Sequence, residues 1–334
     1  MMLDMEHKIY DVLILGGGPS GLTAAIYTSR AHLNTLVVAG QPSGGQLMWT
    51  SEVENFPGFP EGVLGPDLID KFNKQALRFN SEFVYENVVE LKKCPFGLFG
   101  VVTDAKNVYI GKAVIVATGA SARWLGLESE QRLRGKGVSA CATCDGFFFK
   151  DKITAVAGGG DAAMEEAIFL TKFSPKVYIV VRNPQNELRA SVYMLKKAQN
   201  NPKIQFIYST EIREVLGDTG VEGIKIFNTK TGTESVLADV KGLFVSIGHK
   251  PNTEFLKGLV DLGKMDYATV RDNVFTAQEG LFIAGDVADY KYRQAITAAG
   301  FGCMAAIDAE KYLSKFDEDK NLPSYQEIYD KCFA

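Results

Sequence analysis

The residues with the clearest chemical potential are two cysteines separated by two residues, Cys141 and Cys144, with Asp145 directly after them. A two-residue gap lets the sulfurs close a disulfide within one turn, and it places one thiol where it can lower the pKa of the other. A neighbouring carboxylate can hold or release the proton that moves when the disulfide opens and closes. We therefore predict reversible thiol–disulfide chemistry with these three residues as the catalytic group.

A structural zinc site is the alternative use of such a cysteine pair, and it needs two further ligands at similar spacing. The remaining candidates are isolated along the chain: Cys94, Cys303, Cys332, His7, His32 and His249. We therefore expect no bound metal.

The other cysteines form no close pair, and five is an odd number, which differs from the pattern of a disulfide-stapled secreted domain. We expect Cys303 and Cys94 to be inert thiols and Cys332 to be an exposed one without a partner. This usage is typical of a reducing compartment, so the expected location is the cytoplasm.

Two glycine-rich turns each join a buried strand to a helix. The first follows the strand 10–15 and contains Gly16, Gly18, Pro19, Ser20 and Gly21. The second follows the strand 152–157 and contains Gly158, Gly160, Asp161, Ala162 and Ala163. Missing side chains at such turns let backbone amides at a helix N-terminus approach a pyrophosphate, so two copies predict two dinucleotide sites.

The position about 20 residues after each turn contacts the ribose of a bound dinucleotide. After the second turn this position falls on Arg182, whose guanidinium suits a 2′-phosphate and favours NADPH. After the first turn it falls on Ala39 and Gly40, with no acidic residue. The residues alone leave the dinucleotide of the first site open.

The second nucleotide fold is expected to be inserted into the first. Short loops at 117–120 and 246–252 flank it, and a strand at 281–284 followed by a helix at 295–312 completes the first fold. We predict an α/β protein with two Rossmann-like three-layer domains, one of residues 1–119 and 249–334 and the other of residues 120–248.

Composition excludes other classes of protein. Hydrophobic residues make up 46% of the 334-residue chain and charged residues 23%, as in globular proteins. The net charge of -4 provides no electropositive field for nucleic acid. The apolar run near the start is too short for a signal peptide or a membrane span, so neither nucleic acid nor a membrane is an expected partner.

Six segments together resemble the low-molecular-weight thioredoxin reductases across nearly the whole chain. They are residues 44–47, residues 52–58, residues 117–120, residues 138–148 around the cysteine pair, residues 285–287 and residues 293–295.

The resemblance implies that FAD occupies the first glycine turn and NADPH the second. The residues implied to contact FAD are Gly16, Gly18, Pro19, Ser20, Gly21, Gly45, Gln46, Leu47, Asn55, Val88, Thr118, Gly119, Gly285, Asp286, Arg293, Gln294 and Ala295. Those expected to contact NADPH are Gly158, Gly160, Asp161, Ala162, Ala163, Arg182, Asn183 and Arg189.

The resemblance also implies an order of electron transfer. NADPH reduces the flavin, the flavin reduces the Cys141–Cys144 disulfide, and the inserted domain swings about its two linkers so that the thiols meet thioredoxin. Cys144 is implied to face the flavin and Cys141 to attack the partner. A homodimer is implied as well.

The chain departs from the family pattern at the coenzyme site. The family places two adjacent arginines and a third at the 2′-phosphate, whereas here Asn183 follows Arg182 and Arg189 stands a few residues on. Ala162 also occupies a position where many relatives have a hydroxyl. NADPH is therefore the expected coenzyme, with NADH as the alternative.

Three other functions remain open. A reductase of a peroxiredoxin-type system needs an additional thioredoxin-like region, for which residues 1–9 leave no room, so it would need a separate carrier. A dithiol oxidase would pass electrons to oxygen, and such relatives tend to lose the pyridine-nucleotide site that Gly158 and Arg182 indicate here. A flavin-binding redox sensor without turnover would have the same binding motifs.

Overall fold

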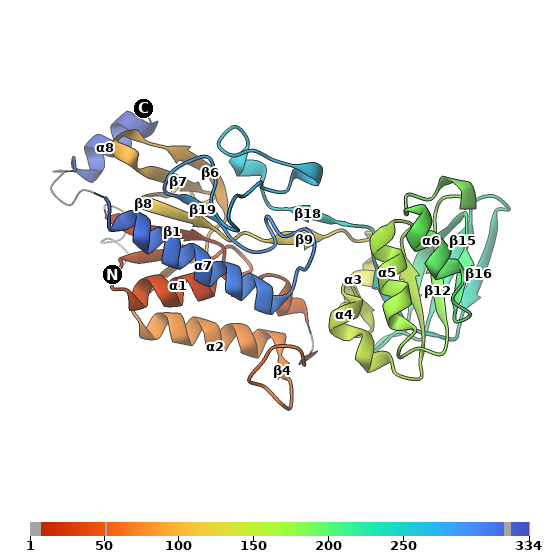
Figure 1. Cartoon of the computed structure of the whole chain (residues 1–334). Coiled ribbons are helices and arrows are strands. Elements are labelled where there is room, and N and C mark those ends of the chain that lie inside the picture. The colour runs from red at the N-terminus through yellow and green to blue at the C-terminus, as the bar shows by residue number, and fades with distance from the viewer. Residues whose placement is uncertain (1–7, 51, 317–321, 334) are drawn as a thin grey trace. The chain divides into compact units, whose positions relative to one another are not determined.

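The computed structural model describes residues 8–50, 52–316 and 322–333. The chain divides into two compact units, drawn in Figure 1. Unit 1 comprises Met1–Thr50, Phe56–Ser121 and Lys250–Ala334, and unit 2 comprises Ser51–Asn55 and Ala122–His249. The sequence places the boundaries after Gly119 and Gly248, and the units divide after Ser121 and His249.

A seven-stranded sheet forms the centre of unit 1. Its parallel strands are β1 (Ile9–Leu15), β2 (Thr35–Val38), β5 (Glu82–Val84), β8 (Val108–Val116) and β19 (Leu281–Ile283). Two antiparallel strands, β6 (Val88–Lys93) and β7 (Phe99–Thr103), extend the sheet beyond β8.

Alternation along β1 explains the layers of unit 1, because successive strand side chains point to opposite faces. Val12 and Ile14 pack against helices α1 (Pro19–Arg30) and α7 (Ala295–Leu313), whereas Leu13 and Leu15 pack on the other face. All four side chains are fully buried. Helix α2 (Gly65–Arg78) lies beside α1, as Figure 1 shows.

Unit 2 repeats this arrangement around a five-stranded parallel sheet. Its strands, in spatial order, are β10 (Val138–Ser139), β17 (Val240–Val245), β11 (Ile153–Ala157), β12 (Val177–Val180) and β13 (Ile204–Ile207). Helices α5 (Asp161–Leu170) and α6 (Val192–Gln199) cover one face. The antiparallel strands β14 (Thr210–Leu216), β15 (Gly223–Asn228) and β16 (Thr233–Leu237) form a separate sheet, and β14 and β15 pack on the other face. The predicted class, two three-layer α/β units with the second inserted into the first, is confirmed.

Smaller elements complete the chain. Strands β9 (Ala120–Ala122) and β18 (His249–Pro251) pair with each other where the chain passes between the units, and β3 (Glu52–Val53) pairs with β4 (Val63–Leu64). The short helices are α3 (Glu128–Arg132), α4 (Ala142–Asp145) and α8 (Tyr325–Phe333). None of the helices within the described ranges has the length and apolar character needed to cross a bilayer.

The structure corrects the expectation for two cysteines. Cys332 is bonded to Cys94, so the prediction of an unpaired, exposed terminal thiol is wrong, and so is that of an inert Cys94 thiol. The two residues are 238 positions apart, and such a pairing depends on the completed fold rather than on local spacing. Cys303 in α7 is a free, half-buried thiol.

Candidate active site

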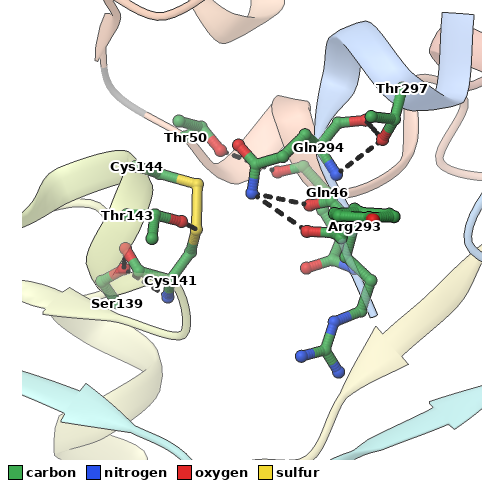
Figure 2. Close-up of a disulfide and its surroundings, with 10 residues drawn as sticks. Gln46, Thr50, Ser139, Cys141, Thr143, Cys144, Arg293, Gln294 and Thr297 are labelled. Atoms are coloured by element: carbon green, nitrogen blue, oxygen red, sulfur yellow. Dashed lines mark hydrogen bonds between the residues drawn. A yellow bond between two sulfur atoms is a disulfide. The ribbon is translucent and has the colours of Figure 1, made fainter. Parts of the chain in front are cut away.

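The cysteine pair lies at the start of α4, where Cys141 is the N-cap and Cys144 is in the first turn. Figure 2 shows their disulfide, with the Cα atoms 5.3 Å apart. The Asp145 amide donates to the Cys141 carbonyl oxygen at 3.1 Å, which closes the helical turn that brings the sulfurs together. Both cysteines are half-buried, so a reaction partner can reach the disulfide.

Ser139, at the end of β10, fixes the entry to this turn. Its Oγ accepts the Cys141 amide at 3.0 Å and also hydrogen-bonds the Asp145 side chain. The Thr143 hydroxyl lies 3.3 Å from Cys141 Sγ and must be the donor, since a disulfide sulfur carries no hydrogen. The sequence analysis predicted a role for neither hydroxyl. The position of Ser139, two residues before Cys141, is the sequence feature that could have indicated its role.

The Asp145 carboxyl group has an environment suited to holding a proton. Its Oδ1 is shielded from solvent and has no hydrogen-bond partner among the described residues. Burial raises the pKa of Asp145 above its ordinary value, and the hydrogen bond from Ser139 partly opposes this rise. A carboxyl group that stays protonated closer to neutral pH can donate a proton to a departing thiolate.

The first glycine turn forms a tight cradle between β1 and α1. Gly16 has a φ of 122°, and a Cβ there would lie 2.7 Å from the carbonyl carbon of Ala117 and closer still to its oxygen. Gly18, in contrast, faces open space, with nothing within 4 Å of a built Cβ. Ser20 Oγ is buried and finds no hydrogen-bond partner within the described part of the chain. A phosphate group fits these features, because it can accept from an orphaned hydroxyl and from the α1 N-terminus.

Asp286 follows β19 and carries a second orphaned polar atom, since its Oδ1 is shielded from solvent and has no hydrogen-bond partner in residues 8–50, 52–316 or 322–333. Burial raises the pKa of Asp286 to about 7; the charge of Asp289 adds to this rise and that of Arg293 opposes it. A ligand hydroxyl that donates to this oxygen would supply the missing hydrogen bond. The site thus fits a sugar alcohol or ribose such as a dinucleotide carries.

Strand pairing brings three of the sequence-predicted segments together in unit 1. Leu15 and Ile283 both pair with Val116, so the carboxyl ends of β1, β8 and β19 are neighbours. The segments that follow these ends contain Gly16, Gly18, Pro19, Ser20, Gly21, Thr118, Gly119, Gly285 and Asp286. Ligands of open α/β sheets bind outside the carboxyl ends of the strands.

The remaining residues predicted for the first cofactor come from other elements. Gly45, Gln46 and Leu47 lie in the 3-10 helix η1 (Gly45–Trp49), and Gln46 Nε2 donates to the Ala120 carbonyl at 2.6 Å. Val88 begins β6 and packs against the core. Asn55 belongs to the segment that groups with unit 2.

The N-terminus of α7 is held by a capping box between Gln294 and Thr297, drawn in Figure 2. Thr297 Oγ1 accepts the Gln294 amide at 3.3 Å, and Ala295 is the first helical residue. Arg293, directly before the cap, has a left-handed φ of 49°. The predicted triplet 293–295 therefore forms a fixed helix start, which is a common place for an anionic ligand group.

The second glycine turn joins β11 to α5 and is braced by the segment that follows β12. Gly158 has a φ of 153°, and a Cβ there would lie 3.0 Å from the Ser246 carbonyl carbon, whereas Gly160 faces open space. The amides of Arg189 and Ala190 both donate to the Gly159 carbonyl at 3.1 Å. This contact brings Arg189 to the turn despite the intervening residues.

The side chains predicted to contact the coenzyme have different settings around this turn. Arg182 and Arg189 are exposed, and neither forms an ion pair within the described part of the chain. Asn183 is half-buried, and its carbonyl accepts the Ser209 amide at 3.1 Å. Asp161 Oδ1 accepts the Ser191 amide at 2.6 Å, while Ala162 and Ala163 lie in the first turn of α5. Two exposed guanidinium groups beside a phosphate cradle fit a 2′-phosphate.

Among the described residues, no group of three or more His, Cys, Asp or Glu side chains could hold a metal ion. The Cys141–Cys144 disulfide also leaves these sulfurs without the thiolate form that zinc requires.

Comparison with known proteins places this geometry in a family. Residues 10–302 match the family described as pyridine nucleotide-disulphide oxidoreductase. The thioredoxin reductase of Mycolicibacterium smegmatis is 49% identical over 318 residues, covering 94% of this chain and 100% of that protein. The thioredoxin reductase of Streptomyces coelicolor is 51% identical over 323 residues, covering 94% and 98%. The crystal structure of thioredoxin reductase from Streptococcus pyogenes has a TM-score of 0.87 at 37% identity, covering 92% of this chain and 98% of that one.

These matches span nearly the full length of both partners, and they confirm the resemblance that the sequence motifs indicate. The chain belongs to the pyridine nucleotide-disulphide oxidoreductase family and, within it, to the low-molecular-weight thioredoxin reductases, which are oxidoreductases that act on a sulfur group.

Proposed function

We propose that this protein reduces the disulfide of thioredoxin with electrons that pass from NADPH through FAD to the Cys141–Cys144 pair. The observation that carries the proposal is the disulfide of α4, which is accessible, lies in the unit that contains the second glycine turn, and is followed by a buried carboxyl group. Thioredoxin enters as the partner that the relatives' names state.

The two cofactors are assigned to the two glycine turns. Residues 1–119 and 249–334 would hold FAD, with Ser20, Asp286 and the start of α7 as its polar contacts. Residues 120–248 would hold NADPH, with Arg182 and Arg189 at its 2′-phosphate. When bound, FAD takes a hydride from NADPH and delivers two electrons to a disulfide.

The chemistry of the reduced pair follows from the residues of α4. The Cys141 thiolate attacks one sulfur of the partner disulfide, and the other partner sulfur leaves and takes a proton. Cys144 then attacks Cys141 Sγ, which releases the second partner sulfur and restores the Cys141–Cys144 disulfide. Asp145 supplies and recovers the proton, and Ser139 holds the carboxyl group and the Cys141 amide in register.

Replacing Asp145 by asparagine is expected to lower the turnover number with thioredoxin about 100-fold, the usual contribution of a positioned acid. Because burial raises the pKa of Asp145, wild-type activity that needs the protonated acid should decline as pH rises through that pKa. In Asp145→Asn this decline should be absent, and a pH profile of kcat would show it. Asp218→Asn, on an exposed turn of the same unit, is the control that should keep the wild-type profile. A variant profile that still declines with pH would assign the proton to another group.

Replacing Arg182 by alanine should lower kcat/KM for NADPH about 10-fold or more and leave kcat/KM for NADH unchanged. The reason is the loss of one charge-assisted hydrogen bond, worth roughly 1.5 to 3 kcal/mol. Asn183→Arg should shift the preference further toward NADPH. Steady-state kinetics with both coenzymes tests this, and a wild-type protein that clearly prefers NADH would contradict the coenzyme assignment.

The visible spectrum of the purified protein tests the proposal as a whole. It should show bound flavin, which bleaches when NADPH is added without oxygen and recovers when oxidised thioredoxin follows. Bleaching by a dithiol but not by NADPH, with recovery on admission of air, would instead indicate a dithiol oxidase. Bleaching without recovery by thioredoxin would indicate a redox sensor, and a colourless protein that cannot bind added FAD would refute the proposal.

Two further properties belong to this proposal. A homodimer is proposed from the family resemblance, and equilibrium sedimentation of the flavin-loaded protein would test it. A cytoplasmic location is proposed from the single vicinal cysteine pair, because lasting disulfide frameworks are typical of oxidising compartments.

A further inference from the structure

A second cysteine pair, away from the active-site turn, closes a disulfide within unit 1. Cys94 caps the 3-10 helix η2 (Pro95–Gly97), Cys332 lies in the last turn of α8, and their Cα atoms are 5.1 Å apart. This spacing is within the usual range for a disulfide. The bond therefore links the end of the chain to the turn between β6 and β7.

The surroundings of the bond form an apolar seat for α8. Cys94, Leu98, Ile110 and Ile328 are all buried in one cluster. Cys94 is only 4% exposed, whereas Cys332 is partly accessible. One sulfur of the pair is thus open to a reagent and the other is enclosed.

The seat is shaped for the last residues of the helix. A Cβ at Gly100 of β7 would lie 2.5 Å from the Phe333 ring and 3.1 Å from Cys94 Sγ, so the ring occupies space that any other residue would fill. A glycine within a strand often marks such a close approach. Lys92 Nζ lies over the Phe333 ring, 4.9 Å from its centroid.

At the other end of α8, the Tyr325 hydroxyl donates to the Val108 carbonyl oxygen at 2.8 Å. A helix of nine residues is marginal in water by itself and depends on its packing. Docking of α8 therefore rests on the apolar seat, Tyr325 and the disulfide together.

We propose that Cys94 and Cys332 are a second redox site, at which a dithiol reduces the disulfide and releases α8, and the disulfide form of the same reagent reoxidises the two thiols and fastens α8. The term C-terminal clasp is used below for this disulfide together with α8 and its seat, Leu98, Ile110 and Ile328.

The exchange balances in two steps. One thiolate of the dithiol attacks the accessible Cys332 Sγ, a mixed disulfide forms, and the Cys94–Cys332 bond breaks with Cys94 as the leaving thiolate. The second thiol of the reagent then attacks the reagent's first sulfur, which is bonded to Cys332 in the mixed disulfide, and so releases the Cys332 thiolate. The dithiol loses two electrons and two protons, and the two protein thiols gain them.

Burial links this exchange to movement of the helix. The Cys94 thiolate would leave into apolar surroundings, where an unpaired charge is strongly disfavoured. Lifting α8 admits water and removes that penalty, so reduction and release of the helix are expected to occur together. In reducing compartments, disulfides are most often redox-sensing ones. If the proposed function is correct, the protein's own product is a dithiol of the required class.

The experiment uses the flavin-loaded full chain in buffers of oxidised and reduced dithiothreitol, with alkylation and peptide mass spectrometry to follow each cysteine. Hydrogen exchange is measured on the same samples. In the oxidised buffer Cys94 and Cys332 should resist alkylation and the amides of 325–333 should be protected. In the reduced buffer both cysteines should alkylate, and protection of α8 should fall at least tenfold while that of α1 is unchanged.

Two variants sharpen the result. Cys332→Ser should show the low protection in both buffers, and Cys303→Ser, which removes the free thiol of α7, should respond as the wild type does. Full alkylation of Cys94 and Cys332 in the oxidised buffer, or equal protection of α8 in both buffers, would overturn the clasp. Neither readout involves NADPH or thioredoxin, so failure here is distinct from failure of the proposed function.

Discussion

Replacing Cys144 by serine should abolish reduction of thioredoxin, with turnover falling by more than about 1,000-fold, because no disulfide can form with a hydroxyl in place of the second sulfur. Cys141→Ser should do the same, since it removes the other half of the couple. Turnover is measured with NADPH as the donor and oxidised thioredoxin as the acceptor.

The controls separate loss of the couple from loss of the fold. Cys144→Ser should still bleach its flavin with NADPH, because the glycine turn of β11 and α5 does not involve α4 sulfurs. Cys303→Ser should retain full turnover, since Cys303 is a free thiol within α7. Thioredoxin reduction that persists in a Cys141→Ser, Cys144→Ser double variant would mean that another pair performs the chemistry.

Replacing Gly302 by alanine should destabilise unit 1 by about 3 kcal/mol and reduce its flavin content, since overpacking typically costs about 1 to 3 kcal/mol and a rigid neighbour puts this site at the upper end. A methyl at Gly302 of α7 would lie 2.9 Å from the Ser20 carbonyl carbon and closer still to its oxygen. Backbone atoms cannot move aside as a flexible side chain can. The added methyl group must therefore push α1 and α7 apart next to the first glycine turn. Denaturant unfolding and flavin absorbance per chain measure the two effects.

Gly300, two residues earlier in the same helix, is the matched control. A methyl there would have nothing within 4 Å, and alanine is the better helix former by roughly 0.5 to 1 kcal/mol. Gly300→Ala should therefore keep its flavin and be at least as stable as the wild type. Equal effects of the two substitutions would show that helix propensity, and not the approach of α1 to α7, dominates.

Local sequence patterns were sufficient to predict the two glycine turns and the pairing of the active-site cysteines. The turns after β1 and β11 were predicted from glycine spacing because the backbone geometry itself requires glycine, as Gly16 and Gly158 show with φ values of 122° and 153°. The pairing of Cys141 with Cys144 was predictable for a similar reason, since a gap of two residues fixes the reach of the sulfurs.

Features that depend on distant parts of the chain were not predictable. Cys94 and Cys332 meet only after β6, β7 and α8 have packed, and five cysteines permit many pairings. Gly300 and Gly302 look alike in the sequence, although one faces open space and the other a backbone. The role of Ser139 depends on the turn of α4, which places the Cys141 amide over its hydroxyl.

The insertion of unit 2 between residues 121 and 250 has a topological consequence when it is combined with the bond from Cys94 to Cys332. In the oxidised chain the whole inserted segment Ala122–His249 lies inside a covalent ring. A protease cut in any of its loops then opens the ring without producing separate fragments, and the two pieces come apart only after reduction. The parts of unit 1 on either side of the insert, Phe56–Ser121 and Lys250–Ala334, would thus stay covalently joined even when the insert is cut.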